Sequence, residues 1–394
     1  MIAILAVLGN FSSNSSQSPD FGNPTFDYGE PAQVYATTQP VTMVFPTDDP
    51  LVIGGTLGHA RSNHTATLLP DGKVVVAGGI NPTTSSASTL ASIEIYDPTT
   101  RTFSPGGAML TPRSDQTATL LPDGRVLFAG GRDQTGAVLA SAEVYDPTTS
   151  TSQATAPMID ARTSAAAVAL DDGRVFIVGG SDGVNPRSSA EVYDSRKESF
   201  SSAGSLPDGS GFVTAVKLED GGVLISGGDA IGGSLSTAQV YDPTSGDFTV
   251  VAGMQTARTG ATSCLLPDGT VLVVGGFDSS GMANSTAEIY YPGKQAFVFG
   301  VVQLGSPRWR NTTTLLSDGS VLLVGGVDNA GNEIDTVERY YPENGAMGVS
   351  TPVGTMQLGR SSQTATALPD GSVLIVGGSN GTVAISDFDF YKPD

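Results

Sequence analysis

Short apolar segments recur along this chain at a nearly constant interval. Each segment holds four or five mostly apolar residues and ends in a pair of glycines, and the pairs begin at Gly78, Gly130, Gly179, Gly227, Gly275, Gly325 and Gly377. Successive pairs lie 52, 49, 48, 48, 50 and 52 residues apart. A period of about 50 residues, with strand-like segments inside every unit, is typical of a propeller or another array of repeats.

One unit, residues 113–158, contains four strand-like segments. Gln116–Leu121 leads through a Pro-Asp-Gly turn into the apolar segment Arg125–Ala129, Ser141–Tyr145 alternates between polar and apolar residues, and a weaker fourth strand follows. An apolar run bounded by turns suits a strand that is covered on both faces, and Pro-Asp-Gly suits a hairpin turn. Four antiparallel strands per unit make one propeller blade. We therefore expect an all-β, seven-bladed β-propeller.

The glycine pairs have a physical explanation in such a ring. They end the apolar strand, where neighbouring blades crowd together. A Cβ atom there would clash with the next blade, or the backbone needs a positive φ, which glycine adopts at little cost.

A tyrosine and a following aromatic position keep the same register in the units. The tyrosines are Tyr96, Tyr145, Tyr193, Tyr241, Tyr290, Tyr340 and Tyr391, and seven residues after the first six stand Phe103, Ser152, Phe200, Phe248, Phe297 and Met347. Together with the glycine pair, this pattern resembles the kelch repeat, in which the last position is usually Trp. The resemblance spans roughly residues 57–394, is similar to bacterial kelch proteins in particular, and implies a propeller of the general form shared with galactose oxidase.

The seventh unit reaches only its third strand before Asp394, so another segment must complete the ring. An incomplete blade leaves an open sheet edge. We expect Thr42–Phe45 to supply the missing strand, with Val44 or Phe45 at the missing aromatic position. The predicted organisation is an extended arm or signal remnant at residues 1–30 and a single propeller at 31–394, in which 31–56 hold the closing strand and a linker.

An arginine opens six of the seven units, and an acid stands two residues before the tyrosine in the same six. The expected pairs are Arg61 with Glu94, Arg113 with Glu143, Arg162 with Glu191, Arg258 with Glu288, Arg308 with Glu338, and Arg360 with Asp389. The fourth unit lacks both, with Gly211 near the arginine position and Gln239 at the acid position. Because the two losses coincide, we predict structural ion pairs inside single blades, the alternative being unrelated exposed charges.

The composition limits the binding partners and the cellular compartments that we expect for this protein. The net charge is −20, with 19 Lys and Arg against 39 Asp and Glu, which excludes nucleic acid as an expected partner because phosphate binding needs clustered basic residues. Cys264 is the only cysteine, so no intramolecular disulfide forms. Ile2–Leu8 is apolar but too short to span a bilayer. Its likeness to a secretory signal favours an exported, periplasmic or cell-surface protein over a cytoplasmic one.

Catalytic groups are scarce in the sequence. His59 and His64 are the only histidines and belong to one unit, whereas copper-radical oxidases with this form need two His, two Tyr and a Cys joined to a Tyr. We therefore predict no cofactor, no metal and no enzymatic activity. The acids that follow the glycine pairs are expected to cap their own turns, with a Ca²⁺ site as the alternative: Asp133, Asp182, Asp229, Asp278 and Asp328, with Asn380 in the seventh unit.

The best candidate for a binding site is the central mouth. Three residues past the arginine position stand His64, Gln116, Ala165, Thr214, Ala261, Asn311 and Gln363. The larger polar members fall on units 6, 7, 1 and 2, which become neighbours when the ring closes. The binding candidates are His64, Asn63, Asp115, Gln116, Trp309, Arg310, Asn311 and Gln363. The alternative is that these residues only solvate the mouth.

Three functions fit these features. The first is a non-catalytic scaffold that binds a protein or a glycan through its loops and mouth. The second is a structural subunit of a larger cell-surface or membrane-associated complex, docked by the N-terminal arm. A carbohydrate-active enzyme is the third and the least favoured, because the mouth carries few charged residues. A propeller fold alone decides between none of these.

Overall fold

The computed structural model describes residues 50–83, 86–298, 302–343, 346–381 and 383–393. The chain divides into Met1–Val44 and a compact unit, Phe45–Asp394, to which all described residues belong. The predictions for residues 1–30 and for Thr42–Phe45 lie outside the described residues. In the described part, the only helical element is the short 3-10 turn η1 (Pro292–Lys294), and no helix there has the length and apolarity that crossing a membrane requires.

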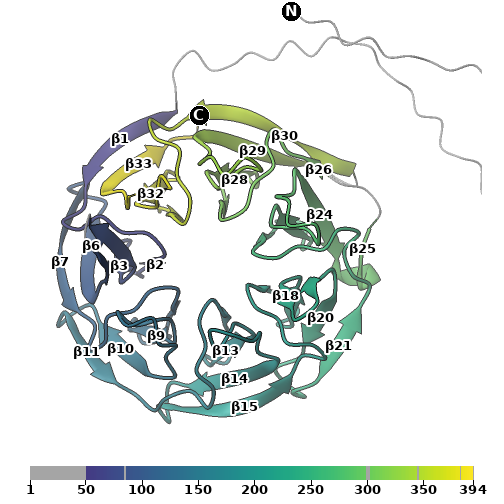
Figure 1. Cartoon of the computed structure of the whole chain (residues 1–394), viewed down its shortest axis with the longest axis horizontal. Coiled ribbons are helices and arrows are strands. Elements are labelled where there is room, and N and C mark those ends of the chain that lie inside the picture. Colours follow the sequence, from purple (N-terminus) through teal and green to yellow (C-terminus); the bar gives the residue numbers. More distant parts are fainter. Residues whose placement is uncertain (1–49, 84–85, 299–301, 344–345, 382, 394) are drawn as a thin grey trace, which may run out of the picture. The chain divides into compact units, whose positions relative to one another are not determined.

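Seven antiparallel sheets stand around a central axis (Figure 1), which confirms the predicted seven-bladed β-propeller. From the axis outward, blade 1 holds β2 (Thr65–Leu68), β3 (Val74–Ala77), β6 (Ser92–Asp97) and β7 (Thr102–Ala108); blade 2, β8 (Thr117–Leu120), β9 (Val126–Ala129), β10 (Ala142–Asp146) and β11 (Thr151–Ala154); blade 3, β12 (Ala166–Ala169), β13 (Val175–Val178), β14 (Ser189–Asp194) and β15 (Ser199–Ser205). Blade 4 holds β16 (Thr214–Lys217), β17 (Val223–Ser226), β20 (Ala238–Tyr241) and β21 (Phe248–Val251).

Blade 5 holds β22 (Thr262–Leu265), β23 (Val271–Val274), β24 (Thr286–Tyr291) and β25 (Ala296–Phe297), with β26 (Val302–Gln303) also paired to β24; blade 6, β27 (Thr312–Leu315), β28 (Val321–Val324), β29 (Thr336–Glu343) and β30 (Ala346–Thr355); blade 7, β31 (Thr364–Ala367), β32 (Val373–Val376), β33 (Asp387–Tyr391) and β1 (Leu51–Thr56). Small hairpins, β4 (Ile80–Thr83) with β5 (Ser86–Thr89) and β18 (Asp229–Ala230) with β19 (Gly233–Ser234), extend the loops after the second strands of blades 1 and 4.

The hydrophobic core lies between neighbouring blades, and the second strand of each blade serves two of these interfaces. In β9, Val126 and Phe128 pack toward blade 1, whereas Leu127 and Ala129 pack toward blade 3. All four are buried. Successive residues of a strand point to opposite faces, so a continuous apolar run is what a strand between two other sheets requires.

The glycine pairs end these strands in a conformation that other residues rarely adopt. In blade 2, Gly130 has φ 67° and Gly131 has φ 92°. A Cβ on Gly130 would lie less than 3.0 Å from the carbonyl oxygen of Arg162 in the next blade, and one on Gly131 equally close to the carbonyl of Ser114. Both parts of the expectation therefore hold: the backbone needs a positive φ, and the neighbouring chain leaves no room for a side chain.

The amino-terminal part of the described chain closes the ring, but not with the predicted residues. β1 pairs antiparallel with β33, and Leu51 stands opposite Tyr391. In most other blades this place holds a phenylalanine, as Phe103 does opposite Tyr96. The closing strand is thus Leu51–Thr56 rather than Thr42–Phe45, and Leu51 replaces the expected aromatic residue.

Blade 6 also departs from the expected spacing. The residue opposite Tyr340 is Ser350, not Met347. The reason is that β29 and β30 continue pairing beyond Tyr340, as far as Glu343 opposite Ala346, with a register shift on the way.

Candidate functional site

Each arginine that opens a blade contacts the acid predicted for it on the third strand of the same blade. The nitrogen–oxygen distances are 2.6 Å for Arg61–Glu94, 2.7 Å for Arg113–Glu143, 2.6 Å for Arg162–Glu191, 3.1 Å for Arg258–Glu288 and 2.8 Å for Arg360–Asp389, and Arg308 contacts Glu338 in the same way. All six arginines are at most 1% exposed.

Blade 2 shows what each pair holds together. Nη1 of Arg113 donates to the carbonyl oxygens of Gly130 at 2.8 Å and Ser141 at 3.0 Å. The carboxylate of Glu143 also accepts a hydrogen bond from the amide of Leu110 at 2.5 Å. Burial lowers the pKa of Arg113, and the charge of Glu143 opposes this shift. The pair therefore joins the start of the first strand, the end of the second and the start of the third, which is a structural role.

Blade 4 replaces this pair with neutral groups. The residue at the arginine position is Ser210, not Gly211, because its carbonyl accepts the amide of Gly180 as the carbonyl of Arg162 accepts that of Gly131. Ser210 Oγ donates to the carbonyl of Gly227 at 2.9 Å, in place of a guanidinium. Gln239 is 7% exposed, and its Oε1 has no hydrogen-bond partner among the described residues. A cavity of only about 10 Å³ remains beside it.

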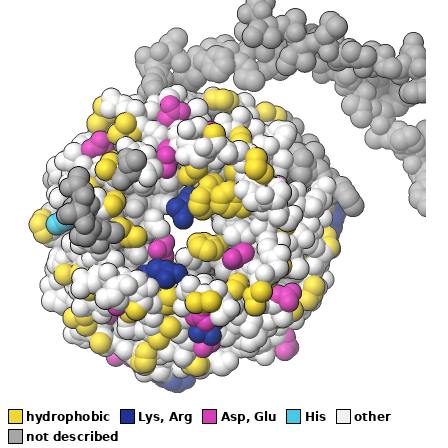
Figure 2. Space-filling view, in the orientation of Figure 1, with side chains coloured by type: hydrophobic (Ala, Val, Ile, Leu, Met, Phe, Trp, Pro, Cys, Tyr) yellow, Lys and Arg dark blue, Asp and Glu magenta, His cyan; other side chains and the backbone are white. Residues whose placement is uncertain are grey.

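The mouth of the central channel is formed by one residue from each blade, two positions past the arginine. We call this set the mouth ring: Asn63, Asp115, Ser164, Phe212, Gly260, Arg310 and Ser362. All seven have φ between 49° and 64°, and all line one cavity of about 580 Å³. Backbone hydrogen bonds link blades along the ring, such as those from the amide of Asp115 to Asn63 and from Ser164 to Asp115. Hydrophobic, basic and acidic side chains gather around this central hollow (Figure 2).

All eight predicted binding residues line this cavity, but they do so in two different ways. Asn63, Asp115 and Arg310 belong to the mouth ring, and Trp309 precedes Arg310. The other four, His64, Gln116, Asn311 and Gln363, are buried and bond to the neighbouring blade.

Gln116 shows the contacts of this buried set: its Nε2 donates to the carbonyl of Ala77 at 3.0 Å. Gln363 Nε2 donates likewise to Val324 at 2.7 Å, and His64 Nε2 is 3.0 Å from Thr364 Oγ1. Burial lowers the pKa of His64 to about 3, so the ring is neutral. These four side chains line the cavity, but hydrogen bonds to the preceding blade hold their polar ends.

One side of the mouth is polar. Asn63 Nδ2 donates to Asp115 Oδ1 at 2.5 Å. Burial raises the pKa of Asp115, while the Asn63 hydrogen bond and the charges of Arg310 and Arg132 oppose the shift. Ser362 on blade 7 and Ser164 on blade 3 continue this side, so that blades 7, 1, 2 and 3 offer hydrogen-bonding groups in sequence.

The other side is aromatic and comes from blades 4, 5 and 6. The rings of Phe277 and Trp309 lie 4.2 Å apart between centroids, and Arg310 Cζ lies 4.2 Å from the centroid of Trp309. Phe212 is 43% exposed. Sequence reasoning missed both phenylalanines. The arginine position of blade 4 was expected from the sequence near Gly211 instead of at Ser210, so Phe212 was not recognised as the counterpart of Asn63 and Asp115. Phe277 directly follows Gly276, a position that was not compared between units.

The acids after the glycine pairs divide into two kinds. Asp133 Oδ1 accepts hydrogen bonds from the hydroxyl of Thr135 at 2.6 Å and from the amides of Thr135 at 2.7 Å and Ala137 at 3.1 Å, which together lower its pKa. Asp182, Asp278, Asp328 and Asn380 likewise accept amides of their own turns, as predicted. Asp229 is different, because it follows Gly228 directly and lines the mouth. Its inclusion with the turn-capping acids is wrong.

The residues of a copper-radical site do not come together in this fold. His59 is largely exposed beside Glu94, His64 is buried, and Cys264 lies half-buried in β22 of blade 5. The described residues contain no cluster of three or more His, Cys, Asp or Glu side chains.

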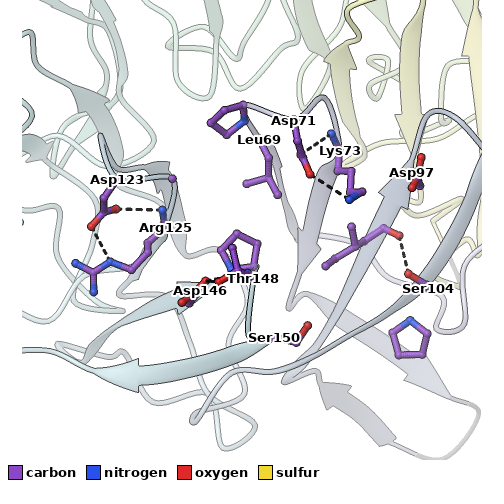
Figure 3. A pocket seen from close by; sticks show the side chains of 15 residues that line it. Leu69, Asp71, Lys73, Asp97, Ser104, Asp123, Arg125, Asp146, Thr148 and Ser150 are labelled. Carbon is purple, nitrogen blue, oxygen red and sulfur yellow. Dashed lines mark hydrogen bonds and ion pairs between the residues drawn. The ribbon is translucent and has the colours of Figure 1, made fainter.

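A second hollow of about 870 Å³ lies between blades 1 and 2, at the Pro-Asp-Gly turns (Figure 3). The first strand of each blade runs from the mouth to this turn, so the hollow opens on the opposite side. Its four acids are engaged locally, since Asp71, Asp97, Asp123 and Asp146 each accept an amide two residues further on. These carboxylates shape hairpins and leave the mouth as the better candidate site.

Comparison with known proteins agrees with this architecture. The family model of the Kelch motif matches residues 60–110 and 162–207, and no curated protein matches significantly. Among solved structures, a fungal alcohol oxidase of the AA5 family, in complex with copper, is 18% identical, with 87% of this chain and 76% of that chain covered and a TM-score of 0.68. YjhT is 13% identical, with 75% and 98% covered and a TM-score of 0.58. Both similarities concern the fold alone. The chain is thus a seven-bladed β-propeller that contains Kelch motifs at residues 60–110 and 162–207.

Proposed function

We propose that this protein is a non-catalytic recognition propeller that binds a saccharide unit of a glycan in its mouth. The observation that carries the proposal is the division of one cavity into an aromatic side and a polar side. Pockets of about 300–1,000 Å³ with apolar walls and a few placed polar groups are typical small-molecule sites, and the mouth measures about 580 Å³. A sugar ring presents C–H groups to aromatic rings and hydroxyls to carboxylates, amides and guanidinium groups.

The polar groups of the mouth are better suited to binding a ligand than to catalysing a reaction. Asp115 is held by Asn63, and His64 is buried, neutral and bonded to Thr364. A nucleophile activated by a neighbouring base needs hydrogen-bond contact between the two groups, and the hydroxyl that His64 contacts, that of Thr364, is not among the residues that line the mouth cavity. The proposal therefore assigns the mouth to recognition.

A protein partner on the same face is the second candidate. Val184 and Ile231, in the loops that follow the glycine pairs of blades 3 and 4, are 87% and 89% exposed. Apolar side chains on adjacent exposed loops are features of interaction surfaces. A partner bound there would cover the rim of the mouth rather than fill it.

Replacement of Arg310 by alanine should weaken glycan binding by about 10-fold or more, because a hydrogen bond to a charged group contributes about 1.5–3 kcal/mol. The measurement is a glycan array followed by calorimetric titration of the best ligand. Arg125→Ala, at a Pro-Asp-Gly turn on the opposite side, is the matched control and should bind normally. Equal affinities of the wild type and Arg310→Ala for that ligand would remove the mouth from consideration. An array without any bound glycan would contradict the proposal as a whole.

A further inference from the structure

Blade 4 departs from the other blades at positions that meet at the mouth. It alone carries glycine, Gly211, where the other blades have Ser62, Ser114, Thr163, Thr259, Trp309 and Ser361. It alone carries an acid, Asp229, directly after its glycine pair, where the others have Ile80, Arg132, Ser181, Phe277, Val327 and Ser379. Gly211 and Asp229 face each other in an isolated antiparallel bridge.

The two changes depend on each other sterically. A Cβ on Gly211 would lie less than 3.0 Å from Asp229 Oδ1, so the carboxylate occupies space that a side chain fills in the other blades. Oδ1 is buried and has no hydrogen-bond partner among the described residues. Burial also raises the pKa of Asp229. Leaving a buried acceptor unsatisfied costs about 1–3 kcal/mol, whereas Asp229 as a whole is only partly buried and lines the mouth cavity.

Two phenylalanines line the same cavity as this carboxylate. Phe212 follows Gly211 and has φ 49°, which is uncommon for a bulky residue and is a form of strain that clusters at functional sites. Phe277 holds on blade 5 the position that Asp229 holds on blade 4. The two blades are joined here, since Thr259 Oγ1 donates to the carbonyl of Gly228 at 3.1 Å. The basic group of the mouth ring, Arg310, interacts instead with Asp115 and Glu333.

We infer that the Asp229 sector of the mouth binds a cationic amine of the ligand, which makes the ligand an amino sugar. This inference rests on the proposed function. An ionised carboxylate only accepts hydrogen bonds, so its partner must bring N–H or O–H donors. An ammonium group brings donors and a charge, and the faces of Phe212 and Phe277 attract a cation as well. The single rounded cavity fits one or two sugar rings better than an extended peptide.

The test compares oligosaccharides of equal length that differ only at one substituent: glucosamine, N-acetylglucosamine and glucose units. Calorimetric titration is done at a pH at which the glucosamine amine is protonated and the carboxylate of Asp229 is ionised. The wild type should bind the glucosamine oligomer about 10-fold more tightly than the other two. Asp229→Asn, which keeps the shape and removes the charge, should lose this preference while still binding the neutral sugars. Asp182→Asn, in a turn of blade 3 where asparagine also caps well, is the matched control. Thermal unfolding checks that both variants are folded.

The outcomes separate the two claims. If the wild type binds all three oligomers equally, the amine inference fails and the proposed function stands. The inference also fails if Asp229→Asn retains the preference. If no oligomer binds, the inference fails, and the glycan array decides whether the proposed function fails as well. Binding of a lysine-rich peptide in an Asp229-dependent manner, without sugar binding, would overturn the assignment to amino sugars.

Discussion

Removal of residues 1–56 should destabilise the propeller by up to about 3–6 kcal/mol relative to removal of residues 1–49, because only the longer truncation removes β1. Two buried phenylalanines of β33, Phe388 and Phe390, pack against this strand. Full burial of one such side chain contributes about 1.5–3 kcal/mol. Loss of β1 also exposes the hydrogen-bonding edge of β33, which is a template for aggregation. Chemical denaturation of the two truncated proteins measures the difference.

A point substitution tests the same strand without shortening the chain. A Cβ on Gly54 would lie less than 3.0 Å from the ring of Phe388, and Gly54 lies where the register of β1 shifts against β33. Gly54→Val should therefore lower the melting temperature, whereas Gly232→Val, at a glycine with open space around it, should change it little.

Identical unfolding curves for the proteins that lack residues 1–49 and residues 1–56 would show that the ring closes without β1.

Replacement of Arg113 by serine should cost about 3–5 kcal/mol, the usual penalty for breaking a buried ion pair from one side. Glu143 would remain in the interior without its countercharge. The carbonyl oxygens of Gly130 and Ser141 would lose their donor. Glu143→Gln should destabilise by a similar mechanism, since the guanidinium would then be the uncompensated charge. Equilibrium unfolding in urea gives the free energies.

Blade 4 supplies the control for this experiment, because it folds with Ser210 and Gln239 at the two positions. The double variant Arg113→Ser with Glu143→Gln reproduces that neutral arrangement. It should be less destabilised than the sum of the single variants by about 0.5–3 kcal/mol, the range for groups in direct contact. Strictly additive costs would show that the arginine and the acid act independently.

The architecture and the ion pairs were predictable because the residues that specify them recur in the same register along the chain. Seven copies of one unit reveal which positions every blade needs, and a paired exception is informative: the coincident loss of arginine and acid in blade 4 identified partners about 30 residues apart. The glycine pairs were predictable for the same reason. A Cβ on Gly130 or Gly131 in blade 2 would clash with a backbone carbonyl, as it would at the corresponding glycines of the other blades.

The closing strand could not be chosen in the same way. Pairing along β33 uses backbone groups, which every segment of the chain offers, so Leu51–Thr56 has no sequence signature that separates it from Thr42–Phe45. What selects it is shape: Gly54 fits against the ring of Phe388. The residues at the mouth are a similar case, because a shift of one position separates Asp115 in the cavity from Gln116 against blade 1.

The sequence by itself thus determined the number of blades, the strand order within them and the charged pairs that hold each one together, since local periodicity encodes all three. Only the tertiary structure decided which strand closes the ring and which side chains meet at its mouth. Phe212 comes from one position in its repeat and Asp229 and Phe277 from another, and the arrangement of the blades in a ring brings all three to one cavity.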